Sequence, residues 1–334
     1  MKRIILAMTA AALLVGATAC GQAATDAKSE VAQGGSAFQS AGERTAKYGT
    51  DALPGQFPRT IKHAMGETTL KAKPERVVVL DVGELDNVVA LGVQPVGVAY
   101  TEGSPTMPGY IGAKGGTPTS VGTINSLNLE TIAKLKPDLI LGSKLRAEKS
   151  YEKLSKIAPT VFSERPGYTW KANFLLNSAA LDRTDQADKL LADYQSEAKA
   201  VGEAVQAKLG RKPTISPLRF MPNMTRVYAR KSFIGTILAD TGLPTNASGQ
   251  VDDLAVQVGA EQIDRADADW IFVGSYGDPS KTQQNSFQTN PLWQTLGAVK
   301  AGHAKTVADE TWYLGLGVLA ANQVLTELRA QLTS

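Results

Sequence analysis

The sequence predicts an α/β fold of two similar lobes that face each other across a cleft and are joined by one long helix. Three observations support this prediction. Short apolar strands alternate with short helices along most of the chain, which is typical of βαβ units. One pattern occurs twice, at residues 130–141 and 261–272, and a long amphipathic segment, residues 184–209, separates the two halves.

The repeated pattern begins with a glutamate at the start of a predicted helical turn. Glu130 and Glu261 are each followed by isoleucine two residues later, by aspartate eight residues later and then by an apolar strand. A repeat separated by about half of the chain does not fit a solenoid and indicates two lobes of similar build. A matched pair of lobes predicts a ligand between them. Each glutamate alone also has a structural explanation, because an acid favours the positive end of the helix dipole.

The N-terminus indicates export. A basic start, an apolar run over residues 4–15 and small residues up to position 19 predict a signal peptide over residues 1–19, too short to span a membrane. The only cysteine, Cys20, follows at once, where bacterial lipoproteins carry their lipid, and we expect it to be acylated. An ordinary secretory signal with an incidental cysteine is the alternative. With Cys20 acylated, no thiol is left for a disulfide.

The composition then divides the rest of the chain. Residues 20–56 hold few large apolar side chains and predict a flexible, lipid-anchored tether. We expect an N-terminal α/β lobe at 57–180, a connecting helix at 181–210 and a C-terminal α/β lobe at 211–334. Lys and Arg total 35 against 32 acids, and loss of Lys2 and Arg3 leaves 33 against 32. This near-neutral balance gives no support for nucleic-acid binding.

The predicted elements of the N-terminal lobe begin with a β-hairpin at 57–72 that turns near Met65-Gly66. The continuous apolar run at 76–80 fits a parallel strand covered on both faces. Helices are expected at 84–91, 128–136 and 151–157, and further strands at 96–99, 138–142 and 160–162.

The connecting segment has apolar residues on one helical stripe and polar residues elsewhere. The stripe consists of Ala187, Leu190, Leu191, Tyr194, Ala198, Val201, Val205 and Leu209. A surface helix packed on a single domain is the alternative interpretation. In the C-terminal lobe we expect strands at 214–218, 226–228, 270–273 and 305–308, and helices at 233–241, 261–266, 291–296 and 316–332.

Nine stretches of the chain form a specific pattern in their order and spacing. They are Arg76-Val-Val-Val-Leu-Asp81, Leu91-Gly-Val-Gln-Pro-Val-Gly97, Leu127-Asn-Leu-Glu130, Leu135-Lys-Pro-Asp-Leu-Ile140, Ile157-Ala-Pro-Thr-Val161, Ser232-Phe-Ile-Gly-Thr-Ile-Leu238, Thr241-Gly-Leu-Pro244, Asn290-Pro-Leu-Trp293 and Trp312-Tyr-Leu-Gly-Leu-Gly317. With these stretches the chain resembles, over residues 57–332, the substrate-binding lipoproteins of iron–siderophore ABC importers, which share their fold class with cobalamin- and ferrichrome-binding proteins.

The resemblance implies two Rossmann-like lobes bridged by one long helix, as in class III periplasmic binding proteins, with a ligand in the cleft. It also implies that one surface glutamate per lobe docks into arginine pockets of the permease. The matching positions are Glu130 and Glu261, and Glu84 is an alternative to Glu130.

Ligands of doubly wound sheets bind beyond the carboxyl ends of the strands. Arginines and aromatic residues recur at these positions, which suits a large and partly polar ligand. Arg offers forked donors to the negative oxygens of a ferric complex, and rings pack on its apolar linker. The candidate ligand-binding residues are Tyr100, Ser143, Arg146, Arg219, Phe220, Tyr228, Phe233, Tyr276, Trp312 and Tyr313. Trp170 and Trp293 are expected in the core.

The sequence therefore predicts an extracytoplasmic, lipid-anchored and monomeric protein that captures a ferric siderophore and delivers it to an ABC permease. A hydroxamate siderophore is favoured because the scattered arginines suit a complex of low charge. The protein would need no cofactor and no metal ligands of its own, since the siderophore holds the iron. Cobalamin or haem binding by the same fold is the nearest alternative.

Two other classes of function stay open. A surface-anchored α/β hydrolase would require Ser275 to be activated by His63 or His303, although Val273 stands where a nucleophile elbow carries glycine. An adhesion lipoprotein would need no cleft. The only two histidines lie in dissimilar contexts and do not predict a zinc site.

Overall fold

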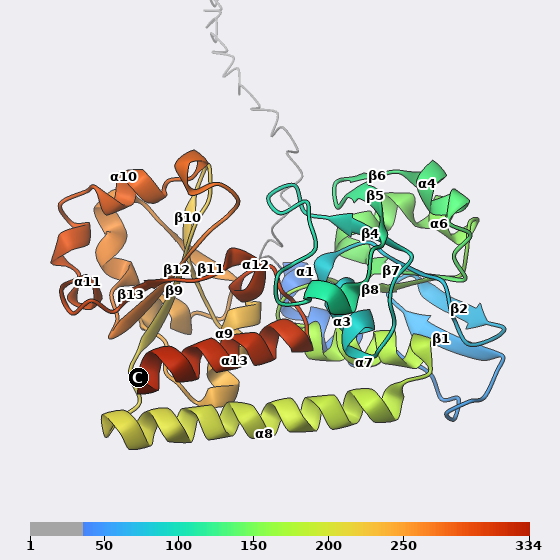
Figure 1. Cartoon of the computed structure of the whole chain (residues 1–334), viewed down its shortest axis with the longest axis horizontal. Coiled ribbons are helices and arrows are strands. Elements are labelled where there is room, and N and C mark those ends of the chain that lie inside the picture. Colours follow the sequence, from blue (N-terminus) through green and yellow to red (C-terminus); the bar gives the residue numbers. More distant parts are fainter. Residues whose placement is uncertain (1–35) are drawn as a thin grey trace, which may run out of the picture.

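The computed structural model describes residues 36–334, so the signal peptide, Cys20 and the first part of the predicted tether lie outside the described residues. The fold is α/β with two lobes that lie side by side above a layer of long helices (Figure 1). The N lobe carries a six-stranded sheet and the C lobe a five-stranded sheet. No helix within residues 36–334 combines the length and the apolar character that crossing a membrane requires.

The N-lobe sheet has the order β6-β5-β4-β3-β7-β8. Its central strand β3 (Val77–Val79) is fully buried and pairs in parallel with β4 and β7, as the continuous apolar run predicted. The other strands are β4 (Gly97–Tyr100), β5 (Thr119–Thr123), β6 (Ser126–Leu127), β7 (Leu139–Ser143) and β8 (Thr160–Ser163). The predicted hairpin is β1 (Arg59–His63) and β2 (Gly66–Leu70), and its turn is the one expected.

The C-lobe sheet has the order β11-β10-β9-β12-β13. Its strands are β9 (Ile215–Phe220), β10 (Thr225–Tyr228), β11 (Ala255–Val258), β12 (Trp270–Ser275) and β13 (Ala304–Thr306). The parallel trio β9-β12-β13 corresponds to β3-β7-β8 of the N lobe, and β7 and β12 are the strands that follow the two repeated glutamates. The lobes differ beyond this trio, because β10 pairs antiparallel to β9 whereas β4 pairs parallel to β3.

The long helix expected between the lobes is α8 (Thr184–Leu209), about 39 Å long at 1.5 Å per residue. It ends at Gly210, which has the left-handed φ of +71° typical of a helix C-terminus. Its buried face includes five residues of the predicted stripe: Ala187, Tyr194, Ala198, Val201 and Val205.

A second long helix, α13 (Val318–Thr333), lies beside α8 and reaches the N lobe with its first turn (Figure 1). There the buried Asp86 of α3 (Val82–Ala90) accepts hydrogen bonds from the backbone N–H groups of Leu319 and Ala320 at 3.0 and 2.9 Å. The lobes are therefore joined by more than the single connector that the sequence predicts.

Direct contacts between α7 (Trp170–Leu181) of the N lobe and α9 (Phe233–Thr241) of the C lobe add to this junction. The indole Nε1 of Trp170 donates to Thr236 Oγ1 at 2.9 Å, and Lys171 Nζ donates to Asp240 Oδ2 at 2.6 Å. Tyr194 of α8 donates to the same carboxylate at 2.7 Å. The bases of the two lobes are thus held together by side chains from three helices.

The prediction of a flexible tether is wrong for residues 36–56. This segment forms α1 (Ser36–Gln39) and α2 (Ala41–Thr45), and Phe38 and Thr45 are buried. The Phe38 ring packs edge-on against Tyr168 at 5.0 Å, and the Arg165 guanidinium lies 3.9 Å from its centroid. The buried Phe38 ring and the ion pair between Arg44 and Glu164 hold this otherwise polar segment on the N lobe.

Of the remaining helices, α4 (Leu129–Lys134) and α6 (Tyr151–Ser155) lie where they were expected, and the other four were not predicted. These four are α5 (Lys144–Ala147), α10 (Gln284–Gln288), α11 (Gly297–Lys300) and α12 (Asp309–Trp312). The segments at 261–266 and 291–296 are 3-10 helices, η4 (Ala260–Ala266) and η6 (Trp293–Thr295), in place of α-helices. The sequence analysis did not predict α5, α7, α10, α11, α12 or the strands β5, β6 and β11.

Replacement of Gly202 by alanine tests the packing of α8 against α9. A Cβ at this position would lie 1.9 Å from the carbonyl oxygen of Thr241. Helix propensity alone would stabilise the variant by about 1 kcal/mol, but the clash with a backbone atom costs more. We expect Gly202→Ala to lower the free energy of unfolding by about 2–3 kcal/mol in urea denaturation. Ala207→Gly on the exposed face is the control and should cost about 1 kcal/mol. Stabilisation by Gly202→Ala would contradict the close approach.

Candidate ligand-binding site

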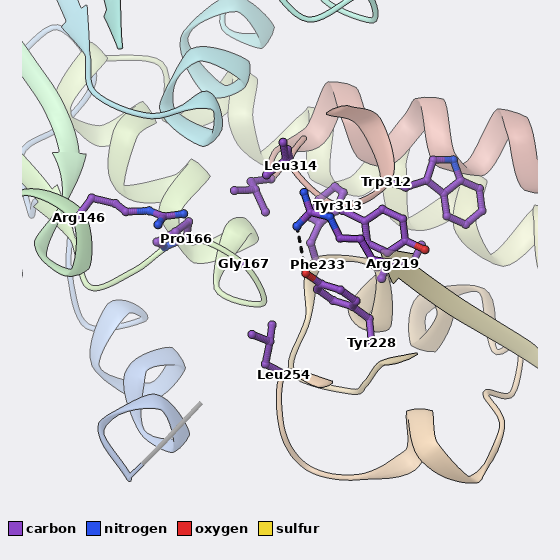
Figure 2. Close-up of a pocket in the computed structure, with 12 residues that line it drawn as sticks. Arg146, Pro166, Gly167, Arg219, Tyr228, Phe233, Leu254, Trp312, Tyr313 and Leu314 are labelled. Carbon is purple, nitrogen blue, oxygen red and sulfur yellow. Dashed lines mark hydrogen bonds between the residues drawn. The ribbon is translucent and has the colours of Figure 1, made fainter. Parts of the chain in front are cut away.

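Six of the ten predicted site residues border one small cavity between the lobes, which we call the inner cavity. Its volume is about 30 Å³. Figure 2 shows Arg146 and Arg219 on opposite sides of this space, one from each lobe. The wall consists of Arg146, Pro166 and Gly167 from the N lobe and Arg219, Tyr228, Phe233, Ile234, Leu254, Trp312, Tyr313, Leu314 and Leu316 from the C-terminal part of the chain.

Arg219 at the end of β9 is fully buried and held in a fixed geometry. Its Nε and Nη2 donate to the two carboxylate oxygens of Asp309 at 2.6 and 2.5 Å, and Nη1 donates to the Tyr228 hydroxyl at 3.1 Å. Burial alone would lower the pKa of Arg219, but Asp309 and Tyr228 raise it above its usual value. These contacts use three of five N–H groups, so two remain for an anionic ligand.

Arg146 of α5 is the corresponding cation of the N lobe. Its Nε lies 3.2 Å from Oδ2 of Asp81, which stands two residues after β3 and caps the N-terminus of α3. Glu84, in the first turn of α3, is buried, and its Oε2 has no hydrogen-bond partner among the described residues. Burial, and then the charge of Asp81, raise the pKa of Glu84 to about 8. Burial thus favours the neutral form of Glu84, whereas Asp81 is paired with Arg146.

Three other predicted residues lie outside the inner cavity. Tyr100 and Ser143 stand at the carboxyl ends of β4 and β7, but Tyr100 packs into the N-lobe core and the buried Ser143 Oγ has no hydrogen-bond partner within the described part of the chain. Tyr276 follows β12 and lines a second, larger cavity. Its ring lies 4.9 Å from the Arg219 guanidinium, so it adjoins the inner cavity from the other side.

The assignment of Phe220 to the ligand site is wrong. Consecutive residues of a strand point to opposite faces, so Phe220 turns away when Arg219 faces the cavity. Its fully buried ring packs against Phe287 at 5.3 Å and Trp293 at 6.3 Å.

The expectation that the Trp312 ring contacts the ligand also needs correction. Trp312 borders the cavity, but Figure 2 shows its indole turned away from the other labelled side chains. The ring is fully buried, stacks on Phe272 at 4.6 Å and donates through Nε1 to Glu327 at 2.5 Å. It belongs to the packing between β12, α12 and α13.

The sequence analysis missed the two carboxylates that hold the arginines, Asp81 and Asp309. Burial raises the pKa of Asp309, while Arg219 opposes this shift. Both aspartates follow a strand closely, Asp81 after β3 and Asp309 after β13. Ligands bind beyond strand ends, so the positions of both aspartates are a signal in the sequence, but acids are not expected to contact an anionic ligand directly.

The two repeated glutamates are exposed. The side chain of Glu130, in the first turn of α4, is 77% exposed and pairs with Lys134 at 2.6 Å. Glu261 lies in the first turn of η4. Both side chains are thus accessible from the surface.

The geometry expected for a hydrolase is not formed. Ser275 Oγ donates to Gln284 Oε1. His63 lies in the N-lobe hairpin, where its Nε2 is hydrogen-bonded to Thr68 Oγ1 at 2.9 Å. His303 stacks on Trp270, which lies at the opposite end of β12 from Ser275. Within residues 36–334, no group of three or more His, Cys, Asp or Glu side chains is arranged to hold a metal ion.

Comparison with known proteins gives consistent matches over most of the chain. Residues 77–311 match a family model described as periplasmic binding protein. The probable siderophore-binding lipoprotein YfiY of Bacillus subtilis (strain 168) is 35% identical over 284 residues, which cover 81% of this chain and 86% of YfiY. The Fe(3+)-citrate-binding protein YfmC of the same organism is 31% identical over 257 residues, and the matched region covers 76% of this chain and 79% of YfmC.

A solved structure agrees with these sequence matches. Staphylococcus aureus SirA complexed with staphyloferrin B superposes with a TM-score of 0.72 at 34% identity, covering 82% of this chain and 98% of SirA.

The raised pKa of Glu84 predicts a pH dependence of stability. Because its folded pKa of about 8 exceeds the unfolded value of about 4.3, the folded state binds more protons between these values. Its contribution is present at low pH and is lost as the pH rises toward 8, with a slope of at most about 1.4 kcal/mol per pH unit. Urea denaturation between pH 5 and 8 should give a smaller slope for Glu84→Gln than for wild type.

A control variant and a second carboxyl group with a raised pKa complete this test. Glu130→Gln, an exposed control, should keep the wild-type slope. Part of the slope should persist in Glu84→Gln, because burial also raises the pKa of Asp86, to about 7. Equal slopes in wild type and Glu84→Gln would show that Glu84 is ionised in the folded protein.

Proposed function

The chain belongs to the periplasmic binding protein family, and from this premise we propose that it captures a ferric siderophore outside the cell membrane and delivers it to an ABC permease. The observation that carries the proposal is the pair Arg146 and Arg219. Each lobe supplies one of these arginines, and both arginines border the same cavity between the lobes. The relatives named for siderophore and ferric citrate binding support the same ligand class.

The chemistry of the site suits binding without catalysis. The guanidinium groups of Arg146 and Arg219 offer donors to the negatively charged oxygens around iron. Phe233, Tyr228 and Tyr313 supply rings for the apolar part of the ligand. The siderophore fills the coordination sphere of the iron, so the protein contributes no metal ligand and needs no cofactor.

Two kinds of ferric complex are candidates for the ligand. A trihydroxamate complex fits the low net charge of the site, because each arginine is balanced by an aspartate at hydrogen-bond distance. A ferric citrate-type carboxylate complex is the second candidate, favoured by the two N–H groups of Arg219 that Asp309 and Tyr228 leave unused and by the similarity to YfmC. Cobalamin and haem are the alternatives in the same fold, and haem is distinguished by its intense Soret absorption.

Delivery requires docking and placement at the membrane. We propose that Glu130 and Glu261, one exposed acid on each lobe, contact basic pockets of the permease. Lipidation at Cys20 would keep a monomeric protein at the outer face of the cell membrane. Cys20 lies outside the described residues, so this proposal depends on the sequence pattern at the signal peptide.

Calorimetric titration with ferrioxamine B, iron(III) citrate, cyanocobalamin and haemin tests the ligand class. We expect at least one of the two ferric complexes to bind, and Arg219→Lys to weaken that binding by about tenfold or more because an ammonium group cannot form the forked contact. Lysine keeps the charge beside Asp309, and thermal melting of the variant checks that it folds.

Arg211→Lys is the matched control for this titration. Arg211 also forms a forked pair with an aspartate, Asp269, but lies on the surface and outside the inner cavity. Its variant should bind as wild type does. Binding of haemin or cyanocobalamin alone would contradict the siderophore proposal, and unchanged affinity in Arg219→Lys would remove this arginine from the site.

Uptake of iron by membrane vesicles that carry the cognate permease tests docking. The double variant Glu130→Ala, Glu261→Ala should reduce uptake by about tenfold, because charged contacts at both lobes are lost while the ligand site is untouched. Its ligand affinity should equal that of wild type. A second double variant, Glu152→Ala with Glu203→Ala, removes two other exposed acids and should transport normally. Normal transport by the first variant would contradict docking through these glutamates.

A further inference from the structure

A second cavity, which we call the outer cavity, lies between the tips of the two lobes. Its volume is about 500 Å³. The N lobe contributes Glu102 and Gly103, which follow β4, and the C lobe contributes residues 221–224, 276–278 and Lys281. The outer cavity has apolar walls at Met221 and Met224 and charged groups at its rim. Its size falls within the usual range for a small-molecule site.

The inner cavity cannot hold such a ligand alone. At about 30 Å³ it has room for little more than a water molecule, whereas ligand sites commonly measure several hundred Å³. Arg219, the best-positioned donor, is fully buried in the wall of the inner cavity. A ligand must therefore open the structure to reach the guanidinium group.

Tyr276 is the side chain that separates the two cavities. It lines the outer cavity, and its ring lies 4.9 Å from the guanidinium of Arg219, which lines the inner one. The ring thus covers the donor group with its face. Displacement of this one side chain would expose Arg219 to the outer cavity.

The contact that holds Tyr276 crosses from one lobe to the other. The backbone N–H of Gly103 donates to the Tyr276 hydroxyl at 3.2 Å. A Cβ on Gly103 would lie 2.6 Å from the tyrosine ring, so this position has room only for glycine while the ring is in place. Gly277, directly after Tyr276, has a left-handed φ of +73°. The ring is therefore held by a single weak hydrogen bond and close packing at the tips of the lobes.

A side-chain movement is favoured over a wide separation of the lobes because of the helical base. The Asp86 contact to α13 and the Trp170 contact to α9 join the lobes on the side away from the outer cavity. Both contacts are buried or partly buried. The cheapest route to Arg219 therefore lies at the tips, where Gly103 meets Tyr276.

We propose that Tyr276 is a gate that merges the inner and outer cavities into one ligand site when its ring leaves Gly103 and Arg219. This proposal rests on the proposed function and adds the orientation of the ligand. The inner end presents the two remaining N–H donors of Arg219, while the outer rim carries the acids Glu102 and Asp278 beside Lys281. The site thus selects a ferric complex with its anionic oxygens at the inner end and a neutral or cationic part at the outer end.

Gly103→Ala tests the gate from the opposite lobe without altering Tyr276. Gly103 does not have a positive φ, so alanine fits the backbone but forces the ring away. With 3-fluorotyrosine at position 276, ¹⁹F NMR of the ligand-free protein should show one resonance in wild type and a shifted one in Gly103→Ala. Ser104→Ala, in the same loop, is the control and should leave the resonance unmoved.

The ligand arm uses gallium(III) desferrioxamine B and gallium(III) citrate, diamagnetic substitutes for the ferric complexes, with calorimetry to establish which binds. The bound complex should move the wild-type resonance toward its position in Gly103→Ala. Stopped-flow mixing with the corresponding ferric complex should give an association rate about fivefold higher or more in Gly103→Ala, and no change in Ser104→Ala.

The results of these experiments distinguish failure of the gate proposal from failure of the proposed function. If a complex binds by calorimetry but neither ligand nor Gly103→Ala moves the resonance, the gate is refuted and the proposed function stands. An unchanged association rate in a Gly103→Ala protein whose resonance has shifted would also refute it, because the ring would not limit access. If neither complex binds the wild-type protein, the proposed function and the ligand role of the gate fail together.

Discussion

The arrangement of the cleft depends on the buried carboxylate of Asp86. It belongs to α3 of the N lobe and accepts two hydrogen bonds from the first turn of α13, where the helix dipole favours negative charge. Burial raises its pKa, and the N–H groups of α13 oppose that shift. Asp86 therefore fixes the start of α13, and α12, which precedes α13 in the chain, carries the Asp309 that orients Arg219. The same helix α3 begins at Asp81, which holds Arg146. One helix thus sets the positions of both cleft arginines.

Each of these arginines has a carboxylate as its partner, the buried Asp81 or the half-buried Asp309, which makes the cleft different from a simple basic pocket. The aspartates fix the guanidinium groups before any ligand arrives, so little side-chain entropy is lost on binding. They also lower the net charge, so a small free anion gains little from the site. Affinity then depends on a ligand that uses the remaining donors together with the apolar walls. A chelate with a large organic frame meets this condition better than an inorganic ion.

The sequence predicted the parts of the fold whose pattern matches their burial. The all-apolar β3 and the one-sided stripe of α8 were both found because burial on two faces and on one face leave different periodicities. Helix α7 was missed because it is buried on most sides and shows almost no amphipathic contrast. Strand β11, at the edge of the C-lobe sheet, has no apolar alternation to mark it. The folding of residues 36–56 depends on Phe38 and on Arg165 and Tyr168, which are more than 120 positions away, so local composition could not reveal it. In the site, strand-end positions located Arg146 and Arg219, but the same rule could not tell Arg219 from its neighbour Phe220, since only the register of β9 decides which side chain faces the cleft.

The short helices α1 and α2 have a mechanical consequence. Tyr168 and Glu164 hold this segment on the N lobe, while Gln39 donates to the backbone of Asp252 on the C lobe at 2.8 Å. Tension along the preceding chain would therefore load both halves of the molecule at once and would not pull on one alone. If the proposed lipid anchor precedes this segment, a pull on the anchor would act on the two lobes together and would not turn one relative to the other.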